Sequence, residues 1–415
     1  MQPGPRLLAT IVGFFAILIA ASITTTAAAL PDSTWTLLSA LPNQPHTAVF
    51  ALGVSPANNQ VVLVGDAQGQ LSRSTDGGVT WKVVRRGTSP INTVTFSPFT
   101  AGLVLAGTRG GGAFVSRDDG ATWSAARGLD GRNVRVFAFA LSVAAAGTDR
   151  GVYTSADGGS WKQSGLADRS ISALAAEAIH DPARLVAGTD QPPASGGLRL
   201  YQSVDAAATW TSFTPAISGT ITTRLAAGPL PPIGNVRPLL VGTNSGMFAS
   251  KDNGTTFTPL SGGGLLPTTD YTQAAFLTTH FDRYYVASDG GGSGGGGLWR
   301  STNGGRSFNS LAPPEVAVTA LAVSGDEKPV LYIATFRPAD HVATLWAFHD
   351  TGGVPQGPRA TPSPVASGAR THAGGDVTLI DELARSGQLP YVGLGLGALA
   401  ILLYAIAAHL RGRYR

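Results

Sequence analysis

Five aspartates in this sequence occupy predicted turns, where paired carboxylates could carry out acid–base chemistry. Two carboxyl groups that flank a glycosidic bond can act as acid and base, or as acid and nucleophile. Aspartate in a turn of this kind is also a common cap for backbone N–H groups. The candidate catalytic residues, for which backbone capping is the alternative interpretation, are Asp66, Asp149, Asp190, Asp289 and Asp340.

A local excess of basic residues is the second feature that could support chemistry. Residues 82–170 contain eleven Lys and Arg against six Asp, whereas the whole chain has 29 basic and 25 acidic residues. Guanidinium groups bind carboxylates through paired hydrogen bonds, so a group of them could hold a peptide or protein ligand. Ordinary solvated surface charge is the alternative. The candidate binding residues are Arg85, Arg86, Arg109, Arg127, Arg132, Arg150 and Arg169.

Other kinds of chemistry are disfavoured by composition. The chain has no cysteine, which excludes disulfides and thiolate chemistry. His341 is the one histidine on the predicted turns, so neither a metal site nor a cofactor is expected. The net charge of +4 is modest, and basic residues are not interleaved with aromatic ones, so a nucleic-acid partner is not expected.

These candidates must be positioned by a repeated element. The pattern Ser-x-Asp-x-Gly-x-Thr-Trp occurs twice in full and four times in degenerate form. The closing aromatics of the six copies are 38 to 51 residues apart, the period of a four-stranded propeller blade. Asp and Gly suit a tight turn, and each copy has too few oxygen ligands for Ca²⁺, so we predict a structural role. The box residues are Ser74, Asp76, Gly78, Trp81, Ser116, Asp118, Gly120, Trp123, Ser155, Asp157, Trp161, Ser203, Asp205, Trp210, Ser250, Asp252, Gly254, Phe257, Ser301, Asn303, Gly305 and Phe308.

Counting strands indicates how the repeat array closes. Seven units have an apolar first strand, yet only six have a box, and the seventh lacks a fourth strand. Trp35 lies 46 residues before Trp81, at blade spacing. We therefore predict that residues 33–40 complete the last blade, because an unpaired edge strand invites aggregation. The predicted fold is all-β, a seven-bladed β-propeller of four-stranded blades that spans residues 33–350 and is closed by an N-terminal strand.

The boxes resemble the Asp-box, or bacterial neuraminidase, repeat. That repeat occurs in sialidases, sortilin-type receptors, xyloglucanase-type glycosidases and the photosystem II assembly and stability factor family. The resemblance covers residues 33–350 and implies that the boxes lie on the face opposite the functional one. A sialidase would carry three substrate-binding arginines, one of them early in the first blade, and a Tyr–Glu pair, yet the opening stretch of the first blade, HTAVFALGVSP, has no arginine. Resemblance to the assembly factors, which carry an arginine patch, instead implies that the arginines bind a peptide or protein.

The two ends of the chain suggest a membrane. Residues 1–29 resemble a signal peptide or, alternatively, an uncleaved signal anchor. The segment 351–388 reads as a Pro/Gly/Ser-rich linker with a juxtamembrane stretch, and Tyr391–Leu410 is apolar and long enough to span a bilayer. The basic tail 411–415 should then remain cytoplasmic, which places the propeller outside the cell membrane.

Three classes of function fit these features. The first is a membrane-tethered extracytoplasmic module that binds a protein or peptide through its loops. The second is a glycoside hydrolase, sialidase-like or xyloglucanase-like, that acts on surface glycans. The third is a structural surface protein. Because one propeller fold hosts unrelated activities, the boxes themselves do not choose among them.

Overall fold

The computed structural model describes residues 30–42, 47–177, 182–231, 236–266, 268–291, 296–337 and 339–360. All of them belong to one compact unit, Met1–Thr361. The predicted signal segment, the linker beyond residue 360, the apolar segment Tyr391–Leu410 and the basic tail lie outside the described residues. Among the residues that are described, no helix is long and apolar enough to span a membrane.

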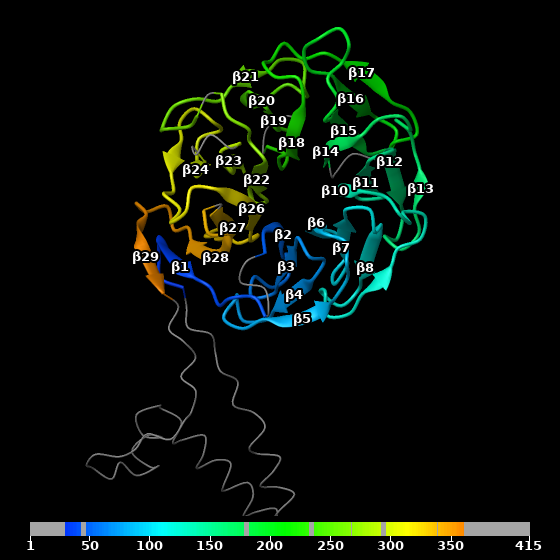
Figure 1. Cartoon of the computed structure of the whole chain (residues 1–415). Coiled ribbons are helices and arrows are strands. Elements are labelled where there is room, and N and C mark those ends of the chain that lie inside the picture. The colour runs from blue at the N-terminus through cyan, green and yellow to red at the C-terminus, as the bar shows by residue number, and fades with distance from the viewer. Residues whose placement is uncertain are drawn as a thin grey trace, which may run out of the picture. The chain divides into compact units, whose positions relative to one another are not determined.

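The described strands form seven sheets arranged around a central axis, as the sequence predicts (Figure 1). Each of the first six sheets is a meander of four antiparallel strands in chain order. The first three blades consist of β2 (Val49–Val54), β3 (Val62–Asp66), β4 (Leu71–Ser74) and β5 (Lys82–Arg85); β6 (Ile91–Phe96), β7 (Val104–Thr108), β8 (Ala113–Ser116) and β9 (Ser124–Ala125); and β10 (Val134–Phe139), β11 (Ala144–Thr148), β12 (Gly151–Ser155) and β13 (Lys162–Gln163).

The next three blades repeat this order. In each of these six blades the first strand is innermost and the fourth is outermost (Figure 1). Their strands are β14 (Ile171–Glu177), β15 (Arg184–Thr189), β16 (Leu200–Ser203) and β17 (Thr211–Phe213); β18 (Thr222–Ala227), β19 (Leu239–Thr243), β20 (Gly246–Ser250) and β21 (Thr258–Pro259); and β22 (Gln273–Leu277), β23 (His280–Ser288), β24 (Gly297–Ser301) and β25 (Asn309–Ser310).

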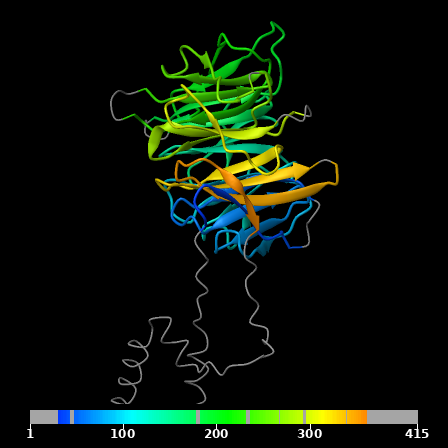
Figure 2. The same cartoon turned by 90° about the vertical axis from the view of Figure 1, so that its left-hand side faces the viewer.

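The seventh blade joins the two ends of the propeller. Its order is β26 (Val318–Val323), β27 (Val330–Arg337), β28 (Val342–His349), β1 (Thr34–Leu37) and β29 (Gln356–Ala360). The N-terminal strand β1 pairs antiparallel with β28, with Trp35 opposite Phe348, which confirms the predicted closure. Figure 2 shows this blue strand among the orange strands of the last blade.

The fifth strand of this blade differs from the sequence-based prediction. Strand β29 pairs parallel with β1, although its residues were assigned to the linker and every blade was expected to have four strands. The sequence QGPRA has none of the apolar alternation that marks a strand. It pairs because β1 would otherwise present an open edge.

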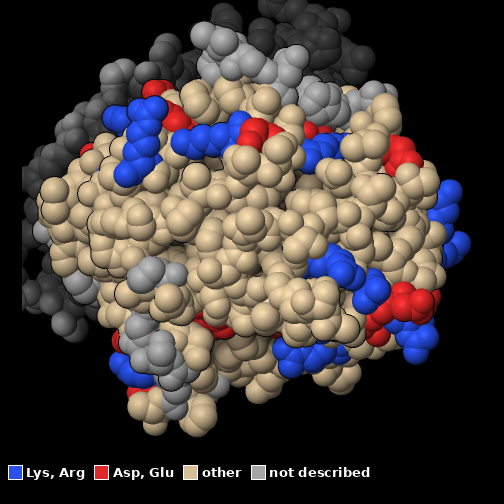
Figure 3. Space-filling model, turned by 90° about the horizontal axis from the view of Figure 1, so that it is seen from above, with Lys and Arg blue, Asp and Glu red and all other residues tan. Residues whose placement is uncertain are grey.

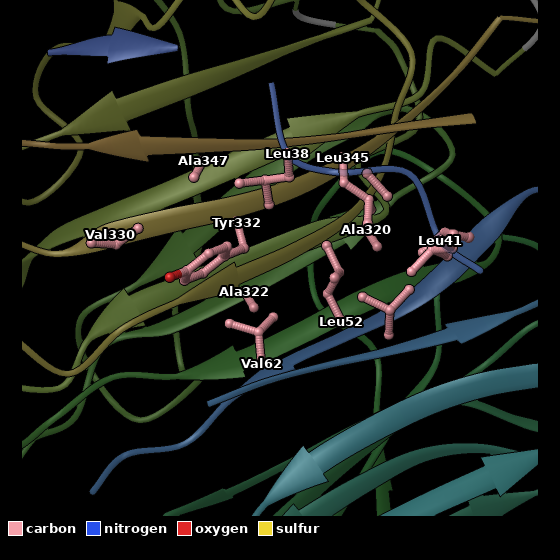
Figure 4. Close-up of a cluster of buried hydrophobic side chains, with 13 residues drawn as sticks. Leu38, Leu41, Leu52, Val62, Ala320, Ala322, Val330, Tyr332, Leu345 and Ala347 are labelled. Atoms are coloured by element: carbon pink, nitrogen blue, oxygen red, sulfur yellow. The ribbon is translucent and has the colours of Figure 1, made fainter. Parts of the chain in front are cut away.

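The hydrophobic core is a ring of seven clusters, one between each pair of neighbouring blades in the described chain. Figure 4 shows the cluster between the seventh and first blades, where Leu38 and Tyr332 pack against Leu52 and Val62. The aromatic residue that closes each box packs against the preceding blade. Trp81 lies in this cluster, and Trp161 lies in the cluster between the second and third blades. Blades therefore depend on their neighbours for burial.

Trp35 is the seventh member of this aromatic series. It is fully buried between the sixth and seventh blades, and its indole N–H donates to the carbonyl of Leu311, 2.7 Å away. Trp81 and Trp210 make the equivalent bonds to Ser39 and Ser164 of their preceding blades. The last blade thus keeps the aromatic of the repeat although it lacks the box.

Glycine near the end of the second strand in the first five blades lets neighbouring blades approach one another. A Cβ at Gly65 would lie 2.3 Å from Ile91 of the next innermost strand, and one at Gly188 would lie 2.4 Å from Thr222. A threonine commonly follows this glycine, and its hydroxyl donates across the next turn. In the third blade the hydroxyl of Thr148 donates to the carbonyl of Gly151. The repeated Gly-Thr pair is therefore set by packing and by the turn.

The meander gives the propeller two distinct faces. Turns between second and third strands lie on the same side as the links between blades, and this side is called the loop face here. Turns between first and second strands share the opposite side with the boxes, which is called the box face. Sequence-predicted candidates on the second-to-third turns therefore lie on the loop face.

Candidate functional site

The Asp boxes are closed hydrogen-bonded turns. In the first, Ser74 donates to Asp76 at 2.7 Å and accepts the amide of Gly78 at 2.8 Å. Asp76 in turn accepts the amide of Thr80 at 2.9 Å and its hydroxyl at 2.5 Å. Both carboxylate oxygens are thus engaged within their own turn, so the box positions backbone and offers no catalytic group.

The other boxes repeat this network, and their variations keep it. In the fourth box the hydroxyl of Thr209, its amide and the Ser203 hydroxyl lower the pKa of Asp205 to about 2. In the sixth box the Asn303 side-chain amide donates to Ser307 at 2.8 Å, where Asp would accept. The bond survives with its direction reversed, which explains why Asn is tolerated there.

Three of the candidate catalytic aspartates are occupied by structural contacts. Asp66 is 1% exposed, and one of its oxygens accepts the amides of Gln68 and Gln70, each at 2.9 Å. Burial raises the pKa of Asp66, although these amide bonds oppose the shift. Asp149 accepts the amide of Asn133 at 3.1 Å, and Asp340 takes two hydrogen bonds from Arg337. The capping interpretation describes Asp66 and Asp149 well.

Asp190 and Asp289 lie in different surroundings. Asp190 forms an ion pair with Arg135 of β10, which extends from the neighbouring blade. Asp289 accepts the amide of Gly291 at 3.0 Å and lies near Asp270, a residue that the sequence did not single out. Burial raises the pKa of Asp270, and the charge of Asp289 raises it further. Asp270 and Asp289 are the two carboxylates that lie near each other on the sixth blade.

The structure separates two of the seven candidate arginines from the rest. Arg85 stacks on Phe114 of the second blade, with its guanidinium carbon 3.4 Å from the ring centroid, and burial lowers the pKa of Arg85. Arg127 pairs through its backbone with Ser160 of the third box. Arg85 is therefore part of a seam between blades, and Arg127 lies beside an Asp box.

The remaining arginines lie on the loop face, on successive loops that are joined to one another by backbone hydrogen bonds. The backbone amide of Arg109 donates to the carbonyl of Pro90, and the backbone amide of Gly112 donates to the carbonyl of Arg132 at 3.1 Å. The carbonyl of Arg169 likewise accepts the amide of Gly151, at 2.7 Å. This succession of loops over blades one to four is called the arginine row; it consists of Arg86, Arg109, Arg132, Arg150 and Arg169.

The arginine row has little neutralising charge. Arg109, Arg150 and Arg169 have exposed side chains that form no ion pair with any described residue. Arg132 approaches Asp149 only to 4.0 Å. On the flank seen in Figure 3, by contrast, basic and acidic side chains stand side by side in small groups around an uncharged area. The row can therefore attract an anionic ligand.

The protein has counterparts of known structure. No protein-family model and no curated protein matches the sequence. YCF48 from Cyanidioschyzon merolae superposes with a TM-score of 0.50 at 16% identity, over 76% of this chain and 98% of its own. A structure described as YCF48 bound to D1 peptide superposes with a TM-score of 0.53 at 16% identity, over 78% and 100%.

A glycosidase has a similar propeller. The GH74 xyloglucanase from Xanthomonas campestris superposes with a TM-score of 0.52 at 14% identity, and the match covers 73% of this chain and 53% of the enzyme. The likeness is one of fold. It is shared by a protein described as bound to a peptide and by an enzyme, so it does not choose between binding and catalysis.

Proposed function

We propose that this protein is a binding or assembly module that holds an anionic peptide segment, with a free C-terminal carboxylate as the preferred group, on the arginine row of its loop face. The observation that carries the proposal is the continuous set of hydrogen-bonded loops that presents the five arginines of the row from adjoining blades. Of these, Arg109, Arg150 and Arg169 are exposed and form no ion pair with a described residue. Guanidinium groups on a preorganised backbone bind carboxylates with paired, charge-assisted hydrogen bonds.

The comparisons support this proposal at the level of fold. YCF48, whose structure is similar over 78% of this chain, is described in a complex with D1 peptide. The broad face made by the turns and links of a propeller suits an extended peptide better than a small molecule. The Asp boxes use their carboxylates in structural hydrogen bonds, chiefly within their own turns, which favours the loop face as the binding surface.

The proposal is tested by selecting peptides from a library with free C-termini and measuring their affinity by fluorescence anisotropy. Arg109→Ala with Arg132→Ala should weaken binding by at least tenfold, since each charged hydrogen bond contributes about 1.5–3 kcal/mol. The matched control is Arg117→Ala with Arg306→Ala, two exposed arginines of the box face. Equal losses in both double variants, or no loss in either, would refute the arginine row as the binding site.

We also propose that the propeller is tethered to a membrane and faces away from the cytoplasm. The support for this is the sequence alone: the apolar segment Tyr391–Leu410 followed by basic residues, and the apolar segment within residues 1–29.

A glycosidase is the second candidate function, and one observation favours it. Asp270 and Asp289 share a turn region on the sixth blade, and the raised pKa of Asp270 suits a general acid. Purified protein should be screened on plant and bacterial glycans. Turnover that disappears in both Asp270→Asn and Asp289→Asn, but persists in Asp340→Asn, would establish hydrolysis in place of simple binding.

A further inference from the structure

The box face has a groove between the fifth and sixth blades, which are neighbours in the ring (Figure 1). Its volume is about 430 Å³, within the range of small-molecule sites. The described lining comes from the first-to-second turn of the fifth blade, the start of β23 and the fifth and sixth boxes. All of these segments lie on the box face, so the groove is separate from the arginine row.

A long turn of the fifth blade forms one wall of the groove. Residues 228–238 separate β18 from β19, and no other blade has as many residues between its first and second strands. Pro231, Val236 and Pro238, which belong to the described part of this turn, line the groove. Proline limits the freedom of the backbone, so a ligand that packs on this wall has less chain to order.

An extended hairpin of the sixth blade forms a second wall. In the first five blades the second strand begins at the residue opposite the box serine, or one residue before it. Strand β23 instead begins at His280, whereas the residue opposite its box serine is Tyr284. The additional residues include Phe281, which is 38% exposed, and Asp282, and both line the groove. The hairpin therefore adds an apolar and an acidic side chain to this seam.

The floor of the groove is apolar and held in place. Leu240, Ala249 and Tyr284 line it and are buried. The Tyr284 ring packs against Phe276 and Phe308, with ring centroids 5.0 and 6.0 Å apart. A ligand with an apolar group thus meets a surface that is already formed, which lowers the cost of binding.

Lys251 lacks the ion pair that its position has in another blade. In the second box the residue after the serine is Arg117, which lies 3.5 Å from Asp157, the aspartate of the next box. Lys251 holds the same position in the fifth box, but the sixth box has Asn303 in place of aspartate. Lys251 is exposed and forms no ion pair with any described residue. The replacement leaves a positive charge beside the groove without a partner.

A negative charge without a partner lies close to Lys251. The carboxylate of Asp282 forms no ion pair with a described residue, and its backbone carbonyl accepts the amide of Gly304 at 2.8 Å. A Cβ placed on Gly304 would lie 3.5 Å from the Lys251 Nζ and 3.9 Å from the Asp282 Cβ. The two side chains therefore flank one point of the sixth box, yet they do not pair with each other.

We propose that this groove binds a free α-amino acid with a large apolar side chain. The ligand carboxylate accepts from Lys251, its ammonium group donates to Asp282, and its side chain packs against Phe281 and the proline wall. An α-amino acid carries both charges next to one side chain, which matches two unpaired charges of opposite sign that flank one point of an apolar groove. Charge-assisted hydrogen bonds at both ends then fix its orientation.

The test measures the melting temperature of the purified full chain at increasing concentrations of four probes. Phenylalanine should raise it with a saturable dose dependence, since a ligand that binds only the folded state stabilises it. Phenylethylamine lacks the carboxylate, phenylpropanoate lacks the ammonium group, and glycine lacks the side chain. Each of these should need a concentration about tenfold higher or more for the same effect, because each loses one of the three contacts.

Two variants assign the two charges separately. Lys251→Met should weaken phenylalanine binding by about tenfold and leave phenylethylamine binding unchanged, because that probe has no carboxylate. Asp282→Asn should weaken phenylalanine binding to a similar degree and leave phenylpropanoate binding unchanged. Lys162→Met, at an exposed lysine of β13, is the matched control and should bind phenylalanine as the native protein does. None of the three side chains is buried, so the variants should melt near the native temperature without ligand.

Three results would overturn the proposal. The first is the absence of any saturable effect of phenylalanine on the native protein. The second is phenylpropanoate binding as tight as that of phenylalanine, which would show that the cationic groups Lys251 and Arg306, another lining residue, suffice. The third is phenylalanine binding that persists in both Lys251→Met and Asp282→Asn, which would place the ligand elsewhere. Each result is independent of peptide binding to the arginine row, which lies on the opposite face.

Discussion

Two box glycines have nearly the same backbone conformation but different surroundings. The φ angles of Gly254 and Gly305 are +81° and +82°. A Cβ at Gly305 would lie 2.0 Å from the hydroxyl of Tyr284, whereas the nearest atom to a Cβ at Gly254 is 3.7 Å away, on Phe257. Gly254→Ala should cost about 1–2 kcal/mol from the left-handed conformation alone. Gly305→Ala should cost about 1–3 kcal/mol more, because the Tyr284 ring is buried and must move.

Urea denaturation of the two variants separates these contributions. The conformational cost is common to both, so the difference between their unfolding free energies reports the overlap with Tyr284. Equal unfolding free energies would show that the tyrosine yields without cost and that the sixth box is not tightly packed.

At the scale of residues, the sequence predicted the role of the boxes and only part of the site. The Ser, Asp, Gly and Thr of a box interact within eight residues, so their local pattern determines their contacts. Arg85 and Arg127 were grouped with the loop-face arginines because sequence does not reveal which way a side chain turns at a strand end. Lys251 and Asp282 were not singled out, since only the packing of the fifth blade against the sixth places them around one groove.

The closing strand is the element on which the ring depends. Trp35 is fully buried, and its indole bonds to Leu311 of the sixth blade. Trp35→Ala should lower the free energy of unfolding by about 3–5 kcal/mol, as loss of a large core aromatic does. Trp123→Ala should cost less, because that ring is only partly buried and its indole bonds to Gly120 of its own box. Chemical denaturation of both variants checks the order, and a larger loss in Trp123→Ala would contradict it.

A buried ion network fastens β28 to the sixth blade. Asp350 is fully buried and accepts from Tyr285 at 2.7 Å, from Arg283 at 3.0 Å and from Arg300. Although burial opposes ionisation, the Tyr285 hydroxyl and the Arg300 charge lower the pKa of Asp350. Asp350→Asn should cost about 3–5 kcal/mol at pH 7, because two guanidinium groups lose their buried partner.

The sign of the shift also fixes how this contribution depends on pH. A carboxyl group with a lowered folded pKa stabilises the protein at any pH above its unfolded pKa, near 3.9, and loses that contribution as pH falls through the folded pKa. The difference in unfolding free energy between native protein and Asp350→Asn should therefore shrink below about pH 4. A difference that stays constant into strong acid would mean that Asp350 does not contribute as a charge.

At the scale of elements, the sequence predicted the strands well wherever the repeat recurs. Seven apolar first strands were expected, and the described chain has all seven, β2, β6, β10, β14, β18, β22 and β26. Strand β29 was missed because a parallel partner, β1, lies more than three hundred residues away in the chain. Its own residues carry no strand pattern, and only the closed blade creates an edge for them.

The proposed topology of the whole molecule can be tested on intact cells. Protease added from outside should remove the propeller and leave a C-terminal fragment that contains Tyr391–Leu410, because the basic residues after that segment should keep its end in the cytoplasm. Detergent-permeabilised cells serve as the control for protease access. A propeller that is degraded only after permeabilisation would reverse the proposed topology.

Hydrogen exchange of the protein with and without a selected carboxylate-terminated peptide tests most directly which face binds. We predict slower exchange in the loops at residues 86–90, 107–112, 127–133, 147–151 and 164–170, which carry the arginine row, because a bound ligand reduces their opening. The amides of the six Asp boxes, on the opposite face, should exchange at unchanged rates. Protection that appears in the boxes, or at neither face while the peptide is bound, would contradict the assignment of the loop face as the binding surface.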